Sequence, residues 1–155
     1  MSWLSGLGLE KLDGTPVGDS LDGKVLVVVN VASFCGYTPQ YAGLEALHRE
    51  AGDGVAVVGV PCNQFGAQEP GTAGEIATFC ETRFGVSFPL LAKQDVNGAG
   101  RSALYQHLIG SGEDVKWNFE KFVVDASGKV VARFPSRVKP EDASLKQALA
   151  TALGA

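Results

Sequence analysis

The chain has 155 residues, a length typical of one domain, and 45% of them are apolar, enough to bury a core without disulfides or metal ions. Its 13 basic and 17 acidic residues give a net charge of −4, and no basic stretch could follow a phosphate backbone, so nucleic acid is not an expected partner. The longest apolar run, residues 25–32, is far too short to cross a bilayer, so stable membrane insertion is not expected.

The N-terminal residues 1–13 do not resemble a secretory signal, because Lys11 follows the apolar residues and no cleavage pattern comes after them. A cytoplasmic, reducing location is therefore expected. The three cysteines form no C-x-x-C pair and do not resemble a disulfide framework; they are Cys35, Cys62 and Cys80. In a reducing compartment such cysteines are either buried small residues or reactive thiols. The two histidines, His48 and His107, lie in unrelated segments, so neither a metal site nor a cofactor is expected.

The first predicted elements are a hairpin over residues 9–22, bounded by two Asp-Gly turns, and a valine-rich strand over residues 24–33. A helix is predicted from Thr38 to about residue 51, with Thr38 as its N-cap and Pro39 at its first position. Tyr41, Leu44 and Leu47 supply the apolar face of this helix, and Glu45 with Arg49 is expected to form an ion pair on the solvent side.

A second buried strand is predicted over residues 55–60, which completes a right-handed parallel β-α-β unit. The next helix is predicted over residues 73–83, where Thr72 and Glu75 form a capping box and Gly85 ends the helix. A third helical pattern covers residues 101–109.

Residues 121–125 and 129–134 are predicted to form a β-hairpin, and Pro140 to open a final helix. The order β-α-β, inserted helix, β-β-α predicts one α/β domain over residues 1–155: a thioredoxin-like fold with a mixed sheet flanked by helices and an N-terminal hairpin. A flavodoxin-like sheet is the alternative, and the late hairpin argues against it.

Cys35 follows the first buried strand and precedes a predicted helix, so it lies at the edge of the sheet where open α/β proteins bind their ligands. The peptide dipoles at a helix start stabilise an anion, and the thiolate is the reactive form of cysteine. From position alone, Cys35 is as well explained as a small turn residue. Thr38 stands where a thioredoxin has its second cysteine, which excludes dithiol exchange within this motif.

Two further stretches carry uncharged N–H donors. Residues 59–70 follow the second parallel strand and include Gln68, while Trp117 and Asn118 precede the late hairpin. Taken alone, the first stretch is more simply explained as an ordinary polar loop, and Trp117 and Asn118 as a core residue and a turn residue. Together they predict a thiolate faced by neutral donors, the arrangement that stabilises charge on the oxygen leaving a peroxide.

Residues 28–41, 61–70 and 117–122 resemble, in order, three motifs of the glutathione peroxidase family. The resemblance implies a thiol peroxidase that reduces hydrogen peroxide and organic hydroperoxides in antioxidant defence. Cys35 would be the peroxidatic residue, at the position of selenocysteine in selenium-containing members. Gln68, Trp117 and Asn118 match the other catalytic residues of the family. Phe34 departs from the pattern, because a polar or charged residue is more common there.

The resemblance also implies a second cysteine, since Cys80 lies where cysteine-type members carry their resolving residue. Cys80 would condense with a Cys35 sulfenic acid, and thioredoxin, or else glutathione, would reduce the product. A buried structural thiol is the simpler interpretation of Cys80, and the same holds for Cys62. The stretch 109–117 is short compared with the tetrameric members, which favours a monomer.

Three other functions use related cysteine chemistry, and of these the peroxide sensor is the alternative that the sequence leaves open. A peroxide-sensing regulatory protein would use the same thiol chemistry without sustained turnover. A copper chaperone would need paired cysteines and a nearby histidine, and a general disulfide oxidoreductase would need a cysteine in place of Thr38.

Overall fold

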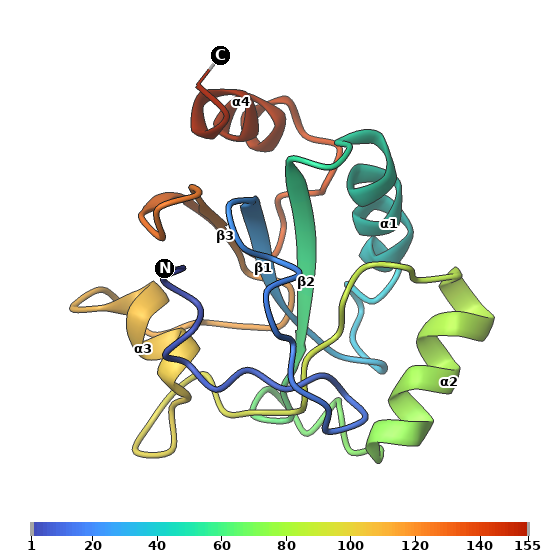
Figure 1. Ribbon diagram of the computed structural model, residues 1–155. Helices are drawn as coiled ribbons and strands as arrows, with labels where there is room; N and C mark the ends of the chain where they lie inside the picture. Colours follow the sequence, from blue (N-terminus) through green and yellow to red (C-terminus); the bar gives the residue numbers. More distant parts are fainter. Residues whose placement is uncertain (1, 155) are drawn as a thin grey trace.

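The computed structural model describes residues 2–154 and is built around a four-stranded mixed sheet of order β2-β1-β3-β4 (Figure 1). Strand β1 (Val25–Val31) pairs in parallel with β2 (Val55–Pro61), and helix α1 (Gln40–Glu50) connects them. Strand β3 (Lys121–Val124) pairs antiparallel with β1 and with β4 (Val130–Phe134). This order of elements confirms the predicted thioredoxin-like arrangement.

Strands β1 and β2 are buried along their whole length, as their continuous apolar sequences predict. Successive side chains point to opposite faces, so the valines of β1 divide between two apolar cores. One core lies against α1, α2 (Ala73–Phe84) and α4 (Ala143–Ala152), and the other against α3 (Ala103–Ile109). Figure 1 shows α3 on the opposite side of the sheet from α1 and α2. None of the helices within residues 2–154 has both the length and the apolar character needed to cross a membrane.

The predicted ends of α2 are confirmed. The Thr72 side chain accepts from the Glu75 N–H, and the Glu75 carboxylate accepts from the Thr72 N–H in return. Gly85 ends the helix at a φ of 58°, a left-handed conformation that glycine adopts without steric cost.

Helix α1 differs from the prediction at two positions. It begins at Gln40, with Pro39 and not Thr38 at the N-cap, because the Thr38 hydroxyl is bonded within the preceding turn. Glu45 does pair with Arg49, but its carboxylate is buried, since it also accepts from the N–H and the hydroxyl of Ser87. Glu45 therefore connects α1 to the segment at Ser87, at a position where the sequence predicted a residue exposed to solvent.

The terminal elements are shorter than predicted. The N-terminal hairpin is reduced to one bridge, between Glu10 and Pro16, closed by hydrogen bonds from the Lys11 N–H to the Thr15 carbonyl and from the Val17 N–H to the Leu9 carbonyl. Helix α4 begins at Ala143. Pro140 lies in the turn before it, which is closed by a hydrogen bond from the Lys139 N–H to the Asp142 carboxylate.

Candidate active site

Cys35 lies in a tight turn that follows β1 and ends where α1 begins. The Cys35 N–H donates to the Thr38 hydroxyl at 2.9 Å, and this hydroxyl donates to the Ala32 carbonyl at 2.8 Å. The Tyr37 N–H donates to the Cys35 sulfur at 3.3 Å. Thr38 thus closes the turn that holds Cys35. The sequence predicted that the start of a helix would stabilise the Cys35 thiolate, whereas in the structure α1 begins only at Gln40 and the N–H that reaches the sulfur belongs to Tyr37 in the turn.

Access to the sulfur is narrow. Cys35 is 8% exposed, whereas its neighbours Phe34 and Tyr37 are 66% and 36% exposed. Cys35 is thus part of an apolar core and is flanked by two aromatic residues that reach the surface.

The loop after β2 is joined to the Cys35 turn by a pair of neighbouring residues. The Gln68 carbonyl accepts from the Phe34 N–H at 3.1 Å. The buried Glu69 carboxylate accepts from the Ser33 N–H at 3.1 Å and from the Ser33 hydroxyl at 2.6 Å. These bonds hold the two loops at the carboxyl ends of the parallel strands together, as the sheet topology predicts.

Trp117 and Asn118 lie against the same loop. The Asn118 Nδ2 donates to Gln68 Oε1 at 3.0 Å, and the Trp117 ring packs edge-on against Phe65. Gly66 has a φ of 67°, which L side chains rarely adopt, and a Cβ there would lie 3.2 Å from Cη2 of Trp117 and 3.5 Å from Cδ of Gln68, so a side chain at this position would be strained. The structure therefore brings Gln68, Trp117 and Asn118 together beside the Cys35 turn.

Asn30 and Lys121 hold the Trp117–Asn118 segment in place, and no pattern in the sequence indicated this role for either residue. Asn30 donates to the Trp117 carbonyl at 3.0 Å and accepts from the Glu120 N–H at 3.1 Å. The Lys121 ammonium donates to the Phe119 carbonyl at 2.6 Å, next to a Phe119 φ of 66°. The sequence did hold one sign of these roles: each is a polar residue within an apolar strand, and a buried polar group requires a hydrogen-bond partner.

Lys121 leads to a prediction about stability and pH. Burial lowers its pKa from 10.5 to about 8, although nearby acids led by Asp142 partly offset this. Between these two pH values the unfolded chain binds more protons than the folded one, so the stability of the protein rises with pH there. Over this range the free energy of unfolding should rise by about 3 kcal/mol in the wild type, and Lys121→Met should remove that rise. Urea unfolding of both proteins between pH 7.5 and 10.5 measures the difference; parallel curves would contradict the prediction.

Cys80 lies on the buried face of α2, as predicted, and is 1% exposed. Burial raises the pKa of its thiol to about 11, with a smaller opposing effect from the Tyr41 hydroxyl beside it. Cys35 and Cys80 belong to the same apolar core, and both are free thiols in the described chain. Cys62 is wholly buried in the other core, and burial raises its pKa as well. Within residues 2–154, no three Cys, His, Asp or Glu side chains gather as metal ligands.

A single thiol in a turn of a thioredoxin-like sheet, beside a cluster of neutral N–H donors, defines a thiol-based oxidoreductase. Residues 7–109 match the model of the family described as glutathione peroxidase, and the chain belongs to this family. It is a thiol peroxidase.

Two relatives and one solved structure agree with this assignment. The chain is 55% identical over 148 residues to a hydroperoxy fatty acid reductase, Gpx2, of Synechocystis, which covers 94% of this chain and 96% of that protein. It is 43% identical to the thioredoxin/glutathione peroxidase BtuE of Escherichia coli, over 84% of this chain and 86% of that protein. The crystal structure of Trypanosoma cruzi GPX1 superposes with a TM-score of 0.75 at 33% identity, and covers 99% of this chain and 97% of that one.

Proposed function

We propose that Cys35 is the peroxidatic residue of this enzyme. Its thiolate attacks one oxygen of ROOH, an S–O bond forms and the O–O bond breaks. The departing RO⁻ takes a proton to give ROH, and Cys35 becomes a sulfenic acid. The observation that carries the proposal is the turn itself, in which Cys35 is 8% exposed beside the Gln68 loop, whereas Cys62 and Cys80 are 0% and 1% exposed.

Gln68, Trp117 and Asn118 stabilise the negative charge on the departing oxygen. All three side chains carry N–H groups and none carries a charge, so they favour the transition state without binding a competing anion. The Asn118 amide occupies Gln68 Oε1, which leaves the Gln68 NH₂ group available as a donor. The main chain at Gln68 and Trp117 is held by the Phe34 N–H and the Asn30 amide, and the Asn118 and Gln68 side chains hold each other, which limits the reorganisation needed during the reaction.

Cys80 then resolves the sulfenic acid. Its sulfur attacks the Cys35 sulfur, an S–S bond forms and water leaves, and thioredoxin reduces the disulfide by thiol exchange. A thiol with a pKa of about 11 is almost wholly protonated at neutral pH and reacts slowly. Movement of Cys80 out of the core would lower its pKa and bring it to Cys35, so the resolving step requires α2 to unwind locally.

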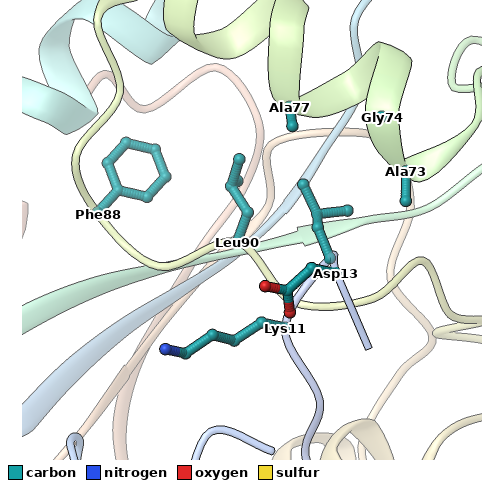
Figure 2. A pocket seen from close by; sticks show the side chains of 8 residues that line it. Lys11, Asp13, Ala73, Gly74, Ala77, Phe88 and Leu90 are labelled. Atoms are coloured by element: carbon teal, nitrogen blue, oxygen red, sulfur yellow. The ribbon is translucent and has the colours of Figure 1, made fainter. Parts of the chain in front are cut away.

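The packing of α2 supports such a movement. Ile76 and Cys80 are the buried residues of its twelve. Figure 2 shows the small residues Ala73, Gly74 and Ala77 along one side of the helix, bordering a cavity of about 300 Å³. A helix that buries so few side chains loses few contacts when it opens, which lowers the free energy of local unwinding.

Thioredoxin-driven turnover tests the resolving role. We expect NADPH consumption with hydrogen peroxide, thioredoxin and thioredoxin reductase to fall at least about tenfold in Cys80→Ser, because the sulfenic acid has no intramolecular partner. One equivalent of peroxide should still be consumed at the wild-type rate. The control Cys62→Ser should turn over normally. Unchanged turnover of Cys80→Ser would assign resolution of the sulfenic acid to glutathione or another external thiol. If the wild-type protein turned over with neither thioredoxin nor glutathione, a peroxide sensor would be favoured.

We further infer that the enzyme acts as a cytoplasmic monomer with thioredoxin as its reductant. The name of the Escherichia coli relative pairs thioredoxin with glutathione, so the two reductants are compared in the same assay. Faster turnover with glutathione than with thioredoxin would reject this choice of reductant.

A further inference from the structure

Glu69 differs from the other buried acidic residues of the described chain in having no positively charged partner. Glu45 pairs with Arg49. Glu120 pairs with Arg133. Glu69 is 0% exposed and forms no ion pair within residues 2–154. A carboxylate taken out of water without a cation beside it is costly, which makes Glu69 a candidate for a functional role.

Hydrogen bonds fix the position of Glu69 and leave one of its oxygens free. Oε1 accepts from the Ser33 N–H at 3.1 Å and from the Ser33 hydroxyl at 2.6 Å, and the Glu69 N–H donates to Asn63 Oδ1 at 2.9 Å. Oε2 has no hydrogen-bond partner within residues 2–154. A buried acceptor without a partner has lost its hydrogen bonds to water, so Oε2 would bind a proton donor that came within reach.

Glu69 is connected to the segments of both cysteines in the proposed cycle. Ser33, to which it is bonded, comes two residues before Cys35. On its other side Glu69 lines a cleft of about 260 Å³ together with Phe79 of α2, and Cys80 follows Phe79 directly. Burial raises the pKa of the Cys80 thiol, and the charge of Glu69 is close enough to add to this effect.

Among the titratable groups that surround it in residues 2–154, Glu69 is the one suited to accept a proton from Cys80. The surrounding groups, taken in chain order from α1 to the segment after α2, are Tyr41, Cys62, Glu75, Cys80 and Lys93. Tyr41 and Cys62 stay protonated, because burial raises the pKa of both groups. Glu75 is exposed, and its carboxylate is engaged in the capping box of α2. Burial raises the pKa of Glu69, although its hydrogen bonds and a nearby lysine oppose this effect, so its carboxylate is a stronger base than an exposed one.

We propose that Glu69 is the proton acceptor of the resolving step: its free oxygen takes the proton of the Cys80 thiol when α2 opens and returns it to the oxygen that leaves Cys35. The Cys80 thiolate attacks the Cys35 sulfur, the S–S bond forms and the S–O bond of the sulfenic acid breaks. The departing hydroxide takes the proton from Glu69 and leaves as water, so the carboxylate is restored and no external base is consumed. The proposal rests on the resolving role of Cys80 proposed above and adds the base that this step requires.

The same carboxylate has the opposite effect on Cys80 before α2 opens. In the core, the negative charge of Glu69 disfavours a second negative charge on Cys80, so the resolving thiol stays protonated while Cys35 reacts with peroxide. Removal of this charge alone would therefore make Cys80 ionise more readily. Removal of a proton acceptor would slow the resolving step, and the two effects are distinguished by experiment.

The first test measures the rate constant of disulfide formation after one equivalent of hydrogen peroxide has oxidised Cys35. Samples are quenched with acid at intervals, free thiols are alkylated, and the Cys35–Cys80 disulfide is quantified by mass spectrometry. In Glu69→Gln this rate constant should fall at least about tenfold at pH 7. The control is Glu75→Gln, which removes a carboxylate from the same cleft and leaves a residue that suits the capping box. Its rate constant should equal that of wild type.

The second test is the pH profile of this rate constant, which a residue that only held the loop would not change. Without the carboxylate, Cys80 must ionise unaided, and an exposed thiol has a pKa of about 8.5. The rate constant of Glu69→Gln should therefore rise about tenfold per pH unit between pH 6 and 8 and come within about twofold of wild type at pH 9.5. Glu69→Asp keeps a carboxylate and should keep the flatter profile of wild type.

An equal loss in Glu69→Gln at every pH would reduce Glu69 to a support of the loop and overturn the proposal. Faster disulfide formation in this variant would also overturn it, because the charge would then only hinder ionisation of Cys80. So would a wild-type rate constant that itself falls about tenfold per pH unit from pH 8 to 6, a result that needs no variant. Sulfenic acid without a disulfide in wild type would remove Cys80 as the resolving residue, and Glu69 with it, while leaving the peroxidase in place. If wild type forms no sulfenic acid, the proposed function itself fails.

Discussion

Replacing Cys35 by serine is expected to abolish peroxide reduction, with a loss on the order of 10⁴-fold or more, as found when a catalytic nucleophile is removed. A hydroxyl at this position is almost wholly protonated at neutral pH, so it cannot displace an alkoxide from a peroxide. The measurement is hydrogen peroxide consumption in the thioredoxin-coupled assay, together with titration of sulfenic acid after one equivalent of peroxide. Neither signal should rise above the protein-free background.

The Cys62→Ser variant is the matched control, because it also replaces a buried sulfur by oxygen but in the core on the α3 side of the sheet. It should keep its activity, with folding checked by circular dichroism. Sulfenic acid in Cys35→Ser, or loss of activity in both variants alike, would contradict the assignment of Cys35 and point to a general effect on the fold.

Replacing Gln68 by alanine is expected to lower the rate of Cys35 oxidation by hydrogen peroxide by about 10²–10³-fold, the usual effect of removing one donor from an oxyanion site. The loss should be specific to the peroxide. Alkylation of Cys35 by iodoacetamide places no charge on a departing oxygen, so its rate should change by less than about threefold. Stopped-flow oxidation and alkylation, measured on the same preparations, provide this comparison.

The control for Gln68 is Gln106→Ala, which removes an exposed amide from α3 whose own hydrogen bond goes to the Arg101 carbonyl. Its two rates should equal those of wild type. Equal losses of oxidation and alkylation in Gln68→Ala would mean that the residue acts on the thiol through the Phe34–Gln68 contact between the loops, and would remove it from the set of donors.

The motifs in the sequence were sufficient to predict the neighbours of Cys35, because each follows or precedes a strand of recognisable pattern. Parallel strands end at one edge of the sheet, so Cys35 after β1 and Gln68 after β2 had to meet there. The bond between Asn118 and Gln68 spans fifty positions, and it confirms that the third motif joins the same loop. The chemical roles of these residues, and of Cys80, stay predictions for the experiments above.

The contacts behind this group could not be predicted from local pattern. Asn30 looked like an interruption of an apolar run, and Lys121 like the first residue of a strand. Thr38 looked like a helix cap, and Glu45 like half of a surface ion pair. In each case a buried polar group took a partner outside its own strand or helix, and propensity and periodicity carry no information on such pairings.

Local patterns in the sequence were enough to predict the order of strands and helices, the burial of β1 and β2, and the capping of α2, because these depend on apolar periodicity and on residues within one turn of each other. Only the folded chain shows how the Trp117–Asn118 segment is held, how few side chains of α2 are buried, and that Phe34 and Phe79 line one cleft. These features depend on surfaces that meet only after the chain has folded, so no segment encodes them alone.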